Sequence, residues 1–577
     1  MSTLRETLDG FPVWQMTVIC LVRFSEPIVF TSMFPYVYFM VRDFGIAKDE
    51  ADISKYTGYL SAAFAFCQFL LCVQWSRLSD VIGRKPVLLG GLFGTGAMIF
   101  LFGFSWNFTV AILARSIMGA LNGNIAVLRT MVGEVATERR HQAIAFTSLP
   151  LLWGLGSIVG PLIGGSKYLT KPPTSVKSLS WSSSYEHFLD TYPYALSNIV
   201  VGGFQFVSML IAFLFLEETH KKFKNRRDLG LDIGDFIRRS LGFKVPPRPW
   251  KKNQTIKNKE LSDEITPLLV GSDITTTNEE SDSVSINSDD DNVIDPFSPT
   301  TRRLSSAILS RYTSNPVEDV ITPTVSRTST FAGEPSGFNR DTFTIPVIET
   351  IVANFLLSFQ NMVFSEFVPV LLAGDFLGDK LQFPFKITGG FGYTPQIIGT
   401  LFSVTGLLGV FVVLFLFPLV DRLYSTLIGY RVATAVLPLV YFVLPLAIFT
   451  VPEYNPSFPP WVTLALVYVL AGFGGLAFAI AYPQIFILNH RASPPQHRAL
   501  INGTVLSATS LARTIAPLAW GNLISLCDSY NVGEVSWWLL SIMAIGGCVQ
   551  ALIMNEHDED LKEVPLLEES GQDEIEA

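Results

Sequence analysis

The segment Trp75-Ser-Arg-Leu-Ser-Asp-Val-Ile-Gly-Arg-Lys-Pro-Val-Leu-Leu89 decides the fold, because it places a charged turn between two apolar stretches. Neither Phe69–Val73 before the turn nor Val87–Phe93 after it contains a charged side chain. A charged side chain at the centre of a membrane-spanning helix costs about 2.5–3.5 kcal/mol. The pattern therefore predicts two membrane-spanning helices joined by a tight turn, and its arginines and lysine favour the cytoplasmic side for that turn.

The composition of the whole chain favours a membrane protein. Its 577 residues are 49% hydrophobic and only 16% charged, with 45 phenylalanines and a mean hydropathy of +0.38. The net charge of −9 comes from acidic residues concentrated in two hydrophilic segments, so it does not indicate a nucleic-acid partner. The five cysteines and six histidines do not cluster at ligand spacing. We therefore expect no disulfide framework, no metal site and no cofactor.

Windows of about 20 apolar residues predict an all-α integral membrane fold with twelve membrane-spanning helices. We expect six spans in residues 1–216 and six in residues 343–555, at Pro12–Val41, Lys55–Trp75, Pro86–Phe104, Thr109–Val132, Ala143–Gly165, Tyr194–Leu216, Thr344–Leu372, Gln396–Leu419, Arg431–Val451, Trp461–Leu488, Ala499–Ser525 and Val535–Met554. Residues 217–342 are expected to be a cytoplasmic, largely disordered loop, and residues 556–577 an acidic cytoplasmic tail. An excess of Lys and Arg in the short loops of one side also predicts that both chain ends are cytoplasmic.

The two halves repeat each other in sequence. Phe24-Ser-Glu26 in the first predicted span recurs as Phe364-Ser-Glu366 in the seventh, and Asp80 recurs as Asp421, followed by Arg422, at nearly the same offset of about 340 residues. Such parallel repeats relate the halves of a transporter about an axis along the membrane normal, with the substrate near the midplane. We therefore expect two pseudo-symmetric six-helix bundles.

The first predicted span contains Arg23 and Glu26, followed by Pro27. Together the two charges cost about as much as roughly ten Leu, Ile, Val or Phe side chains return on insertion. Being three residues apart, they share a helix face and can pair. Two interpretations stay open: a buried ion pair that fixes helix packing, or a carboxylate that takes up protons or faces a substrate.

Glu366 is the counterpart of Glu26 and has Val363, not an arginine, three residues before it. An intramembrane carboxyl group without an evident partner is a candidate proton site, because neutralisation removes most of the cost of burying it. The alternative is a residue near the helix end that reaches headgroups or water. Gln360 and Asn361 are candidates to hydrogen-bond a polar substrate.

The fourth predicted span contains Arg115-Ser-Ile-Met-Gly119-Ala-Leu-Asn-Gly123-Asn124. Arg115 is a candidate to stabilise a neighbouring carboxylate or an anionic substrate group, and Asn124 is a candidate substrate contact. Gly119 and Gly123 form a surface of small residues against which another helix can pack closely. In the eleventh span, Arg513 is a second candidate buried cation.

The fifth predicted span has glycines at four-residue spacing around a proline, in Gly154-Leu-Gly156-Ser-Ile-Val-Gly160-Pro161-Leu-Ile-Gly164. This pattern predicts a helix with a smooth face that packs closely and bends. Either plain helix packing or a conformational role explains the glycines. In the second case, the fifth and eleventh spans slide and bend as the halves rock around a midplane site.

The central segment contains two further signals. The cluster Lys221-Lys-Phe-Lys-Asn-Arg-Arg227 lies next to the sixth span and suits an anionic lipid surface. Glu264-Ile-Thr-Pro-Leu-Leu269 has the form of an acidic dileucine sorting signal, in which Glu264, Leu268 and Leu269 would contact a sorting adaptor. This signal favours the vacuolar or lysosomal membrane, with the plasma membrane as the alternative.

Taken together, these motifs resemble a fungal member of the major facilitator superfamily. The turn is similar to the family's G-x-x-x-D-R-x-G-R-K loop, with Ser76 and Val81 at two of its positions, and Arg115 to Gly119 is similar to its R-x-x-x-G motif. The glycine-rich fifth span resembles that of drug:proton antiporters. Arg23-Phe-Ser-Glu-Pro27 and Leu216-Glu-Glu-Thr-His220 resemble the zinc-induced facilitator-like branch.

The resemblance implies proton-coupled antiport of a small organic solute by alternating access. It implies conformational gating by Asp80, Gly83, Arg84, Lys85, Asp421, Arg422 and the glycine-rich helix. A proton-independent facilitator, or a transporter-like sensor that signals through the central loop, is the alternative. An enzyme is not expected, because no nucleophile–base arrangement or nucleotide-binding loop occurs. We expect a monomer in the lipid bilayer whose partners are the solute and protons.

Overall fold

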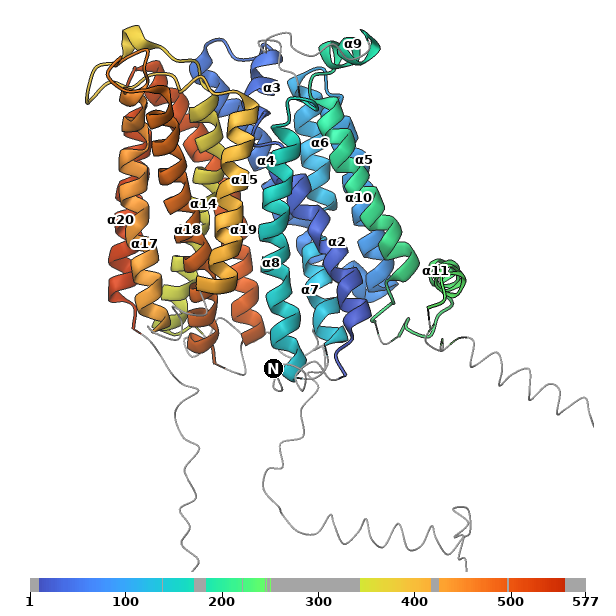
Figure 1. Ribbon diagram of the computed structural model, residues 1–577. Helices are drawn as coiled ribbons and strands as arrows, with labels where there is room; N and C mark the ends of the chain where they lie inside the picture. The colour runs from blue at the N-terminus through green and yellow to red at the C-terminus, as the bar shows by residue number, and fades with distance from the viewer. Residues whose placement is uncertain are drawn as a thin grey trace, which may run out of the picture. The chain divides into compact units, whose positions relative to one another are not determined.

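The computed structural model describes residues 10–136, 139–170, 183–220, 222–243, 245, 248, 250, 343–416, 425–494 and 498–555. These residues are helical, apart from loops and two isolated β-bridges. The long helices run side by side as upright columns, and the chain passes alternately up and down through them (Figure 1). We call the end of the bundle at which Gly83 lies the motif end, and the other the opposite end.

Six helical columns form the N-terminal half. Two of them are interrupted, because α2 is followed by α3 and α6 by α7 along the same column. In chain order the helices are α2 (Val13–Thr31), α3 (Val37–Asp43), α4 (Glu50–Ile82), α5 (Arg84–Gly103), α6 (Phe108–Leu121), α7 (Asn124–Val135), α8 (Arg139–Gly164) and α10 (Ala195–Phe215). The first and fourth predicted spans are therefore each split in two.

Six further columns form the C-terminal half. They are α14 (Ile345–Ala373), α15 (Pro395–Phe411) continued by η2 (Val412–Leu416), α17 (Thr426–Val443) continued by η3 (Pro445–Thr450), α18 (Pro460–Ala492), α19 (Arg498–Ser529) and α20 (Glu534–Ile553). Each of the twelve predicted spans thus overlaps described helices, and the last three residues of the eighth span, 417–419, lie outside the described residues. The main boundary differences are that α4 is longer than expected and that α18 and α19 extend by several residues.

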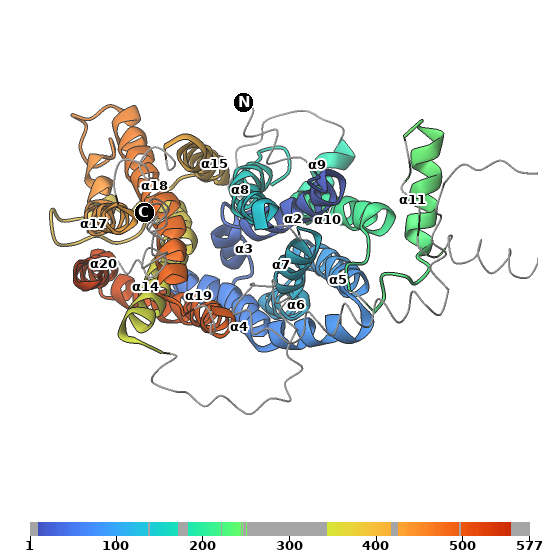
Figure 2. The same cartoon turned by 90° about the horizontal axis from the view of Figure 1, so that it is seen from below.

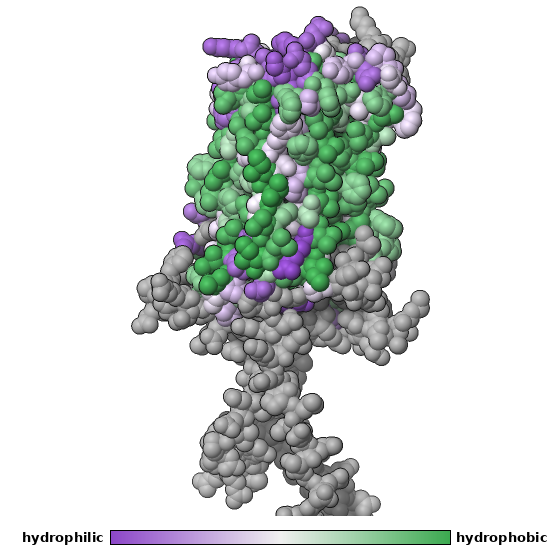
Figure 3. Space-filling view, turned by 90° about the vertical axis from the view of Figure 1, so that its left-hand side faces the viewer, coloured by the Kyte–Doolittle hydropathy of each residue, from purple (hydrophilic) through white to green (hydrophobic). Residues whose placement is uncertain are grey.

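The outer surface has the apolar character that a bilayer requires. By length and composition, eight of the described helices are able to cross a membrane, or nine if the bent α4 is included. Large apolar side chains are exposed on their outer faces, among them Val432 and Leu439 on α17, Leu552 on α20 and Leu210 on α10. Figure 3 shows this as a hydrophobic band between two hydrophilic margins. Exposed apolar area is unfavourable in water, at about 25 cal/mol per Å², so this band indicates lipid contact.

The two halves pack on each other through a reciprocal pair of contacts. The second column of the N-terminal half, α4, packs on the fifth of the C-terminal half, α19, while the fifth column, α8, packs on the second, α15. Figure 2 shows α4 beside α19 in the view along the bundle. This exchange of second and fifth helices is what a pseudo-twofold axis between two repeats produces, and it confirms the predicted pair of six-helix bundles.

Glycines and small residues bring these helices together at the opposite end. A Cβ atom at Gly58 would lie 2.3 Å from the carbonyl oxygen of Pro517, and one at Gly399 would lie 2.4 Å from that of Pro161. Arg42 also pairs with Asp375 across the halves at 3.2 Å. The halves are therefore in close backbone contact at this end.

Two shorter helices lie outside the columns. Helix α9 (Ser183–Thr191) lies at the opposite end, and α11 (Leu229–Ser240) lies at the motif end. Figure 1 shows α11 end-on and Figure 2 shows it lengthwise, so its axis runs across the columns rather than along them.

Candidate functional site

The charged pair of the first column lies inside the N-terminal half. In α2, Arg23 and Glu26 form an ion pair, and their side chains are only 10% and 14% exposed. The guanidinium of Arg23 lies 5.3 Å from the ring centre of Trp153 in α8, a cation–π arrangement. The second carboxylate oxygen of Glu26 accepts a hydrogen bond of 3.5 Å from the amide of Asn122. Glu26 is therefore held on two sides.

Asn122 reaches Glu26 because the fourth column breaks at this level. Helix α6 ends at Leu121, and α7 begins at Asn124. No side chain fits at Gly123, where a Cβ atom would lie 2.3 Å from Trp75. The carbonyl groups freed by the break are satisfied from α4, since Trp75 donates to Ala120 at 2.6 Å and Gln68 donates to Asn122 at 3.2 Å. An interrupted helix of this kind exposes polar backbone only where protein or a cavity covers it.

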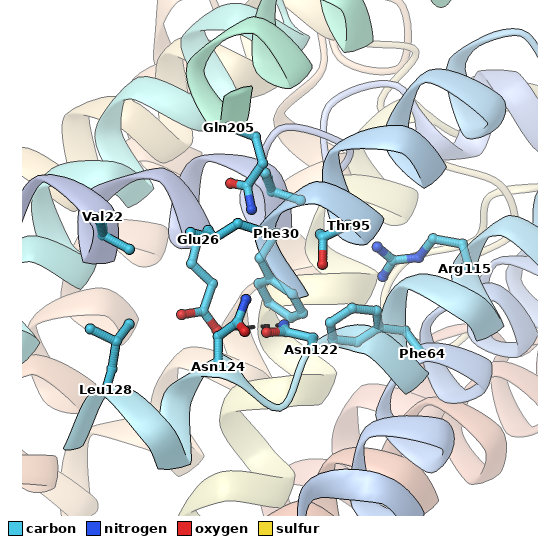
Figure 4. Close-up of a pocket in the computed structure, with 12 residues that line it drawn as sticks. Val22, Glu26, Phe30, Phe64, Thr95, Arg115, Asn122, Asn124, Leu128 and Gln205 are labelled. Atoms are coloured by element: carbon cyan, nitrogen blue, oxygen red, sulfur yellow. Dashed lines mark hydrogen bonds between the residues drawn. The ribbon is translucent and has the colours of Figure 1, made fainter. Parts of the chain in front are cut away.

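A small cavity opens beside Glu26 (Figure 4). Its volume is about 10 Å³, which is room for about one water molecule. The lining residues are Val22, Glu26, Val29, Phe30, Phe64, Leu92, Thr95, Arg115, Asn122, Asn124, Leu128 and Gln205. Thr95 Oγ1 and Gln205 Oε1 are buried without a hydrogen-bond partner among the described residues. These atoms are available to a polar solute or to water.

Arg115 lies deep in the N-terminal half. It is 1% exposed, and its guanidinium lies 4.6 Å from the ring centre of Phe64 and 5.9 Å from that of Phe102. Within the described part of the chain, its Nε and Nη2 atoms have no hydrogen-bond acceptor. Asn124 lies across the same cavity, with its amide against Gly91 of α5. Arg115 thus brings a positive charge with free donors to the cavity.

Glu366 lies at the boundary between the halves. It belongs to α14 in the C-terminal half, is 1% exposed, and accepts a hydrogen bond of 2.6 Å on Oε2 from Ser61 of α4. Its other oxygen, Oε1, is buried with no partner in the described chain. The structure therefore places Glu366 in the interior, not at a helix end in contact with headgroups. The sequence analysis does not predict Ser61, because its partner Glu366 is 305 residues away in the chain and no local pattern connects them.

Arg513 extends from the C-terminal half toward the N-terminal half. Its guanidinium in α19 lies 5.3 Å from the ring centre of Phe30 in α2. It is close enough for electrostatic interaction with both Glu26 and Glu366. Arg115 also interacts electrostatically with Glu366. Each half therefore contributes one carboxyl group and at least one arginine to the centre.

The two amides predicted to contact substrate point in different directions. Asn361 hydrogen-bonds Tyr482 of α18, whose hydroxyl lies 3.5 Å from Ser358 Oγ, and Tyr482 also interacts with Arg513. Gln360 instead lies near Gly547 of α20, so it faces the interior of the C-terminal half. The structure brings Asn361 toward the centre but not Gln360.

The charged turn forms a network at the motif end. Gly83 has a φ of +110°, a conformation that side chains disfavour, and it turns the chain between α4 and α5. Arg84 pairs with Asp80 at 2.5 Å and with Glu134 of α7 at 3.3 Å. Glu218, just after α10, accepts hydrogen bonds from the backbone N–H groups of Arg84 and Lys85 at 3.0 and 3.1 Å. Its charge suits the positive N-terminal end of α5.

The glycines of α8 divide between two partners. Gly156, Gly160 and Gly164 pack against α2 within the same half, where Cβ atoms would meet Pro27, Thr31 and Ser32 at 2.3 Å or less. The contact with the other half is made by Gly154, Pro161 and Gly165 with α15. The fifth and eleventh predicted spans are α8 and α19. Each packs on the second helix of the other half, α8 on α15 and α19 on α4.

Some predicted residues lie outside the described part of the chain. These are Asp421 and Arg422 of the second loop, Lys221 of the basic cluster, and Glu264, Leu268 and Leu269 of the sorting signal.

A second, larger cavity of about 530 Å³ lies at the opposite end, between α3 and α4 of one half and α14, α19 and α20 of the other. Its lining includes Asp49, Glu50, Asp375, Asp528 and Lys380.

Comparison with known proteins agrees with this arrangement. The model of the Major Facilitator Superfamily matches residues 19–272 and 350–572. A "major facilitator superfamily multidrug transporter mfsB" of Aspergillus fumigatus is 32% identical over 563 residues, which are 96% of this chain and 85% of that protein. "Protein ZINC INDUCED FACILITATOR-LIKE 1" of Arabidopsis thaliana is 30% identical over 220 residues, or 38% of this chain and 45% of the plant protein.

The fold also matches a solved transporter. The crystal structure of the nucleoside transporter NupG aligns with a TM-score of 0.55 at 9% identity, covering 94% of this chain and 99% of that one. At this identity the likeness concerns the fold alone. The family match extends over most of the chain, and the fold and the full-length relative agree with it. The chain belongs to the major facilitator superfamily of membrane transporters.

Proposed function

We propose that this transporter exchanges protons for a small organic solute by alternating access around the centre formed by Glu26, Glu366 and Arg513. The two carboxyl groups occupy matching positions in the two halves. Arg513 of one half lies over Phe30 of the other and interacts with both carboxyl groups. A change of charge at either carboxyl group therefore changes the attraction between the halves.

The observation that carries this proposal is the environment of Glu366. The buried carboxyl group accepts one hydrogen bond, from Ser61, and leaves Oε1 without a partner. Burying an ionised carboxylate with so few partners is costly, and binding a proton removes most of the cost. Arg115 and Arg513 contribute positive charge near this carboxyl group. Glu366 is thus placed to cycle between protonated and ionised forms as the surroundings change.

The charges at the centre support an anionic or amphipathic solute. Arg23, Arg115 and Arg513 outnumber the two carboxyl groups of Glu26 and Glu366 there. Aromatic rings of Phe30, Phe64, Trp153 and Tyr482 lie beside these charges. A surface of arginines and rings suits an organic acid with an aromatic or apolar body. The multidrug description of the fungal relative supports a small organic solute.

Zinc itself is not the proposed cargo. Among the described residues, no group of three or more His, Cys, Asp or Glu is placed to hold a metal ion.

We also propose that the motif end faces the cytoplasm, with both chain ends on that side. The loops of that side are rich in Lys and Arg, as positively charged cytoplasmic loops are. The vacuolar or lysosomal membrane is favoured over the plasma membrane by the acidic dileucine pattern that begins at Glu264.

Reconstituted vesicles test the proposal. The full chain is placed in liposomes that contain a pH-sensitive dye, and fluorescein or ethidium is added as an anionic or a cationic test solute. Antiport predicts that solute movement drives a change of internal pH and that an imposed pH gradient drives solute movement. Flux of solute without a change of pH would indicate a facilitator, and absence of any solute flux across a broad panel would indicate a sensor.

A further inference from the structure

Helix α11 lies outside the proposed transport centre and packs on the end of α10. It lies beside the bundle at the motif end, and its axis runs across the columns (Figures 1 and 2). Its inner face packs on the last turn of α10 through glycines. Cβ atoms at Gly230 and Gly234 would lie 2.2 and 2.0 Å from the carbonyl oxygens of Phe213 and Leu214. Helix α11 is therefore fixed where the end of a membrane-spanning helix meets the headgroup layer.

The outer face of α11 is apolar and exposed. Leu229, Ile233 and Phe236 recur at the spacing of one helix face and are 66%, 50% and 71% exposed. Phe243, just beyond the helix, is 63% exposed. A helix that lies in the bilayer surface shows this pattern, because its apolar side enters the acyl boundary while its other side stays polar.

Basic side chains border this apolar face. Lys222, Lys224 and Arg226 precede the helix and are exposed, and Arg239 in its last turn is exposed as well. Arg238 lies over the ring of Trp14 in α2 at 4.2 Å, which fixes the far end of α11 to the bundle. A cluster of cations next to an exposed apolar strip complements an anionic lipid surface.

Ion pairs tie the helix to the charged turn and to the segment that follows α10. Asp228 caps the start of α11 by accepting from the N–H of Leu231, and it also accepts from Lys85 Nζ at 2.7 Å. At the other side, Arg248 pairs with Asp235 at 2.6 Å and with Glu217 at 2.5 Å. Burial lowers the pKa of Arg248, but hydrogen bonds and charges from Asp235 and Glu217 outweigh that effect and raise it, so Arg248 stays charged.

We propose that α11 lies in the headgroup layer with the Leu229, Ile233 and Phe236 face against acyl chains, and that the basic segment Lys222–Arg226 binds anionic lipid headgroups. Because Asp228 joins this segment to Lys85, bound lipid holds the charged turn in place. The inference requires only that the bundle lies in a bilayer, so it stands or falls independently of proton coupling.

Hydrogen–deuterium exchange of the full chain in nanodiscs tests it. One nanodisc contains phosphatidylcholine alone, and the other contains phosphatidylcholine with phosphatidylserine. A basic residue near an anionic surface contributes about fivefold to binding. We therefore expect amide exchange across Leu229–Ser240 to slow by at least about fivefold in the anionic nanodisc. Glycerophosphoserine added to neutral nanodiscs should not reproduce the effect, because it supplies the headgroup without the acyl chains.

The variant Lys222→Gln/Lys224→Gln/Arg226→Gln should lose the difference between the two nanodiscs. Its matched control, Lys48→Gln/Lys167→Gln/Lys386→Gln, removes three exposed cations at the opposite end and should retain it. A second variant, Phe236→Ser, should speed exchange in both nanodiscs. Equal exchange of the wild type in the two nanodiscs would overturn the proposal, as would a difference that survives the first variant or disappears in the control.

Discussion

Glu26 and Glu366 occupy equivalent positions in the two halves but differ in how their charge is balanced. Glu26 has Arg23 and Asn122 as partners, whereas Glu366 has Ser61 on one oxygen and none on the other among the described residues. At the scale of the single residue, this difference assigns them separate roles. Glu26 is held in place by its neighbours, and our proposal assigns proton exchange to Glu366.

Replacing Glu366 by glutamine tests this assignment. Glutamine keeps the hydrogen bond with Ser61 but cannot ionise, so pH-driven solute flux should fall by about 100-fold or more, the scale on which a positioned proton-transfer group acts. Flux measured in proteoliposomes under an imposed pH gradient gives the result. Glu349→Gln in the same helix is the matched control and should transport normally. Normal coupling in Glu366→Gln would show that another group handles the proton.

The pair Arg23 and Glu26 permits a stability prediction. Removing one partner of a buried pair leaves an unpaired charge, so Arg23→Met alone should lower the free energy of unfolding by about 3 kcal/mol or more. The double variant Arg23→Met/Glu26→Leu should recover most of that loss, because neither charge remains. Denaturant unfolding of the purified chain in detergent measures both. If the single and double variants were equally destabilised, the packing of the arginine, not its charge, would be what matters.

At the scale of the element, the turn between α4 and α5 depends on a backbone conformation that only glycine adopts without strain. Gly83 has φ of +110° and ψ of 159°, and the turn lets Glu218 cap α5. The fourth column is different, because its break at Gly123 depends on contact with Trp75. At Gly83 the backbone conformation requires a glycine. At Gly123 the close approach of Trp75 leaves no room for a side chain.

Gly83→Ala should destabilise the protein. A side chain in this backbone region costs about 1–3 kcal/mol, and the new Cβ atom would lie 2.5 Å from Glu218 Oε2. Gly90→Ala in the following helix, α5, is the control, because a Cβ atom there meets nothing within 4 Å. There we expect unchanged or slightly higher stability, since alanine favours helix by about 0.5–1 kcal/mol. Thermal unfolding compares the two, and equal midpoints would mean that the turn is not strained.

How far the sequence predicts these elements depends on whether the signal is local. The twelve spans, the turn and the two carboxyl groups follow from runs of apolar residues and from the charges within them. The break at Asn122 was missed, although Asn-Gly inside an apolar run signals a turn. Helix α11 was missed as well, although Asp228 is a helix-capping residue and Leu229, Ile233 and Phe236 have helical spacing. The partners Ser61, Glu134 and Glu218 are distant in sequence, so no local pattern identifies them.

At the scale of the whole molecule, close contacts join the two halves at the opposite end. Gly58 with Pro517 and Gly399 with Pro161 bring backbones together there, and Arg42 pairs with Asp375 across the halves. Alternating access requires these contacts to separate when the solute passes. The pseudo-twofold arrangement of α4 with α19 and α8 with α15 gives two equivalent contacts between the halves.

A bulky residue at Gly399 should prevent this end from closing. A leucine there would collide with the carbonyl oxygen of Pro161, 2.4 Å from its Cβ atom. In a background without native cysteines, Ser54→Cys in the large cavity should then react faster with a membrane-impermeant thiol reagent. Gly203→Leu, at a position with open space around the Cβ atom, is the control and should leave the rate unchanged. An unchanged rate in Gly399→Leu would mean that this contact does not control access.

The most direct test of alternating access is a pair of distances between the halves, measured by electron–electron resonance of spin labels in the full chain. One pair, Trp106→Cys with Trp461→Cys, reports on the opposite end, and the other, Arg77→Cys with Leu552→Cys, reports on the motif end; all four side chains are exposed. Alternating access predicts reciprocal changes, so that conditions which lengthen the first distance shorten the second, and that Glu366→Gln locks one of the two states. Distances that stay fixed, or that lengthen together at both ends, would contradict it.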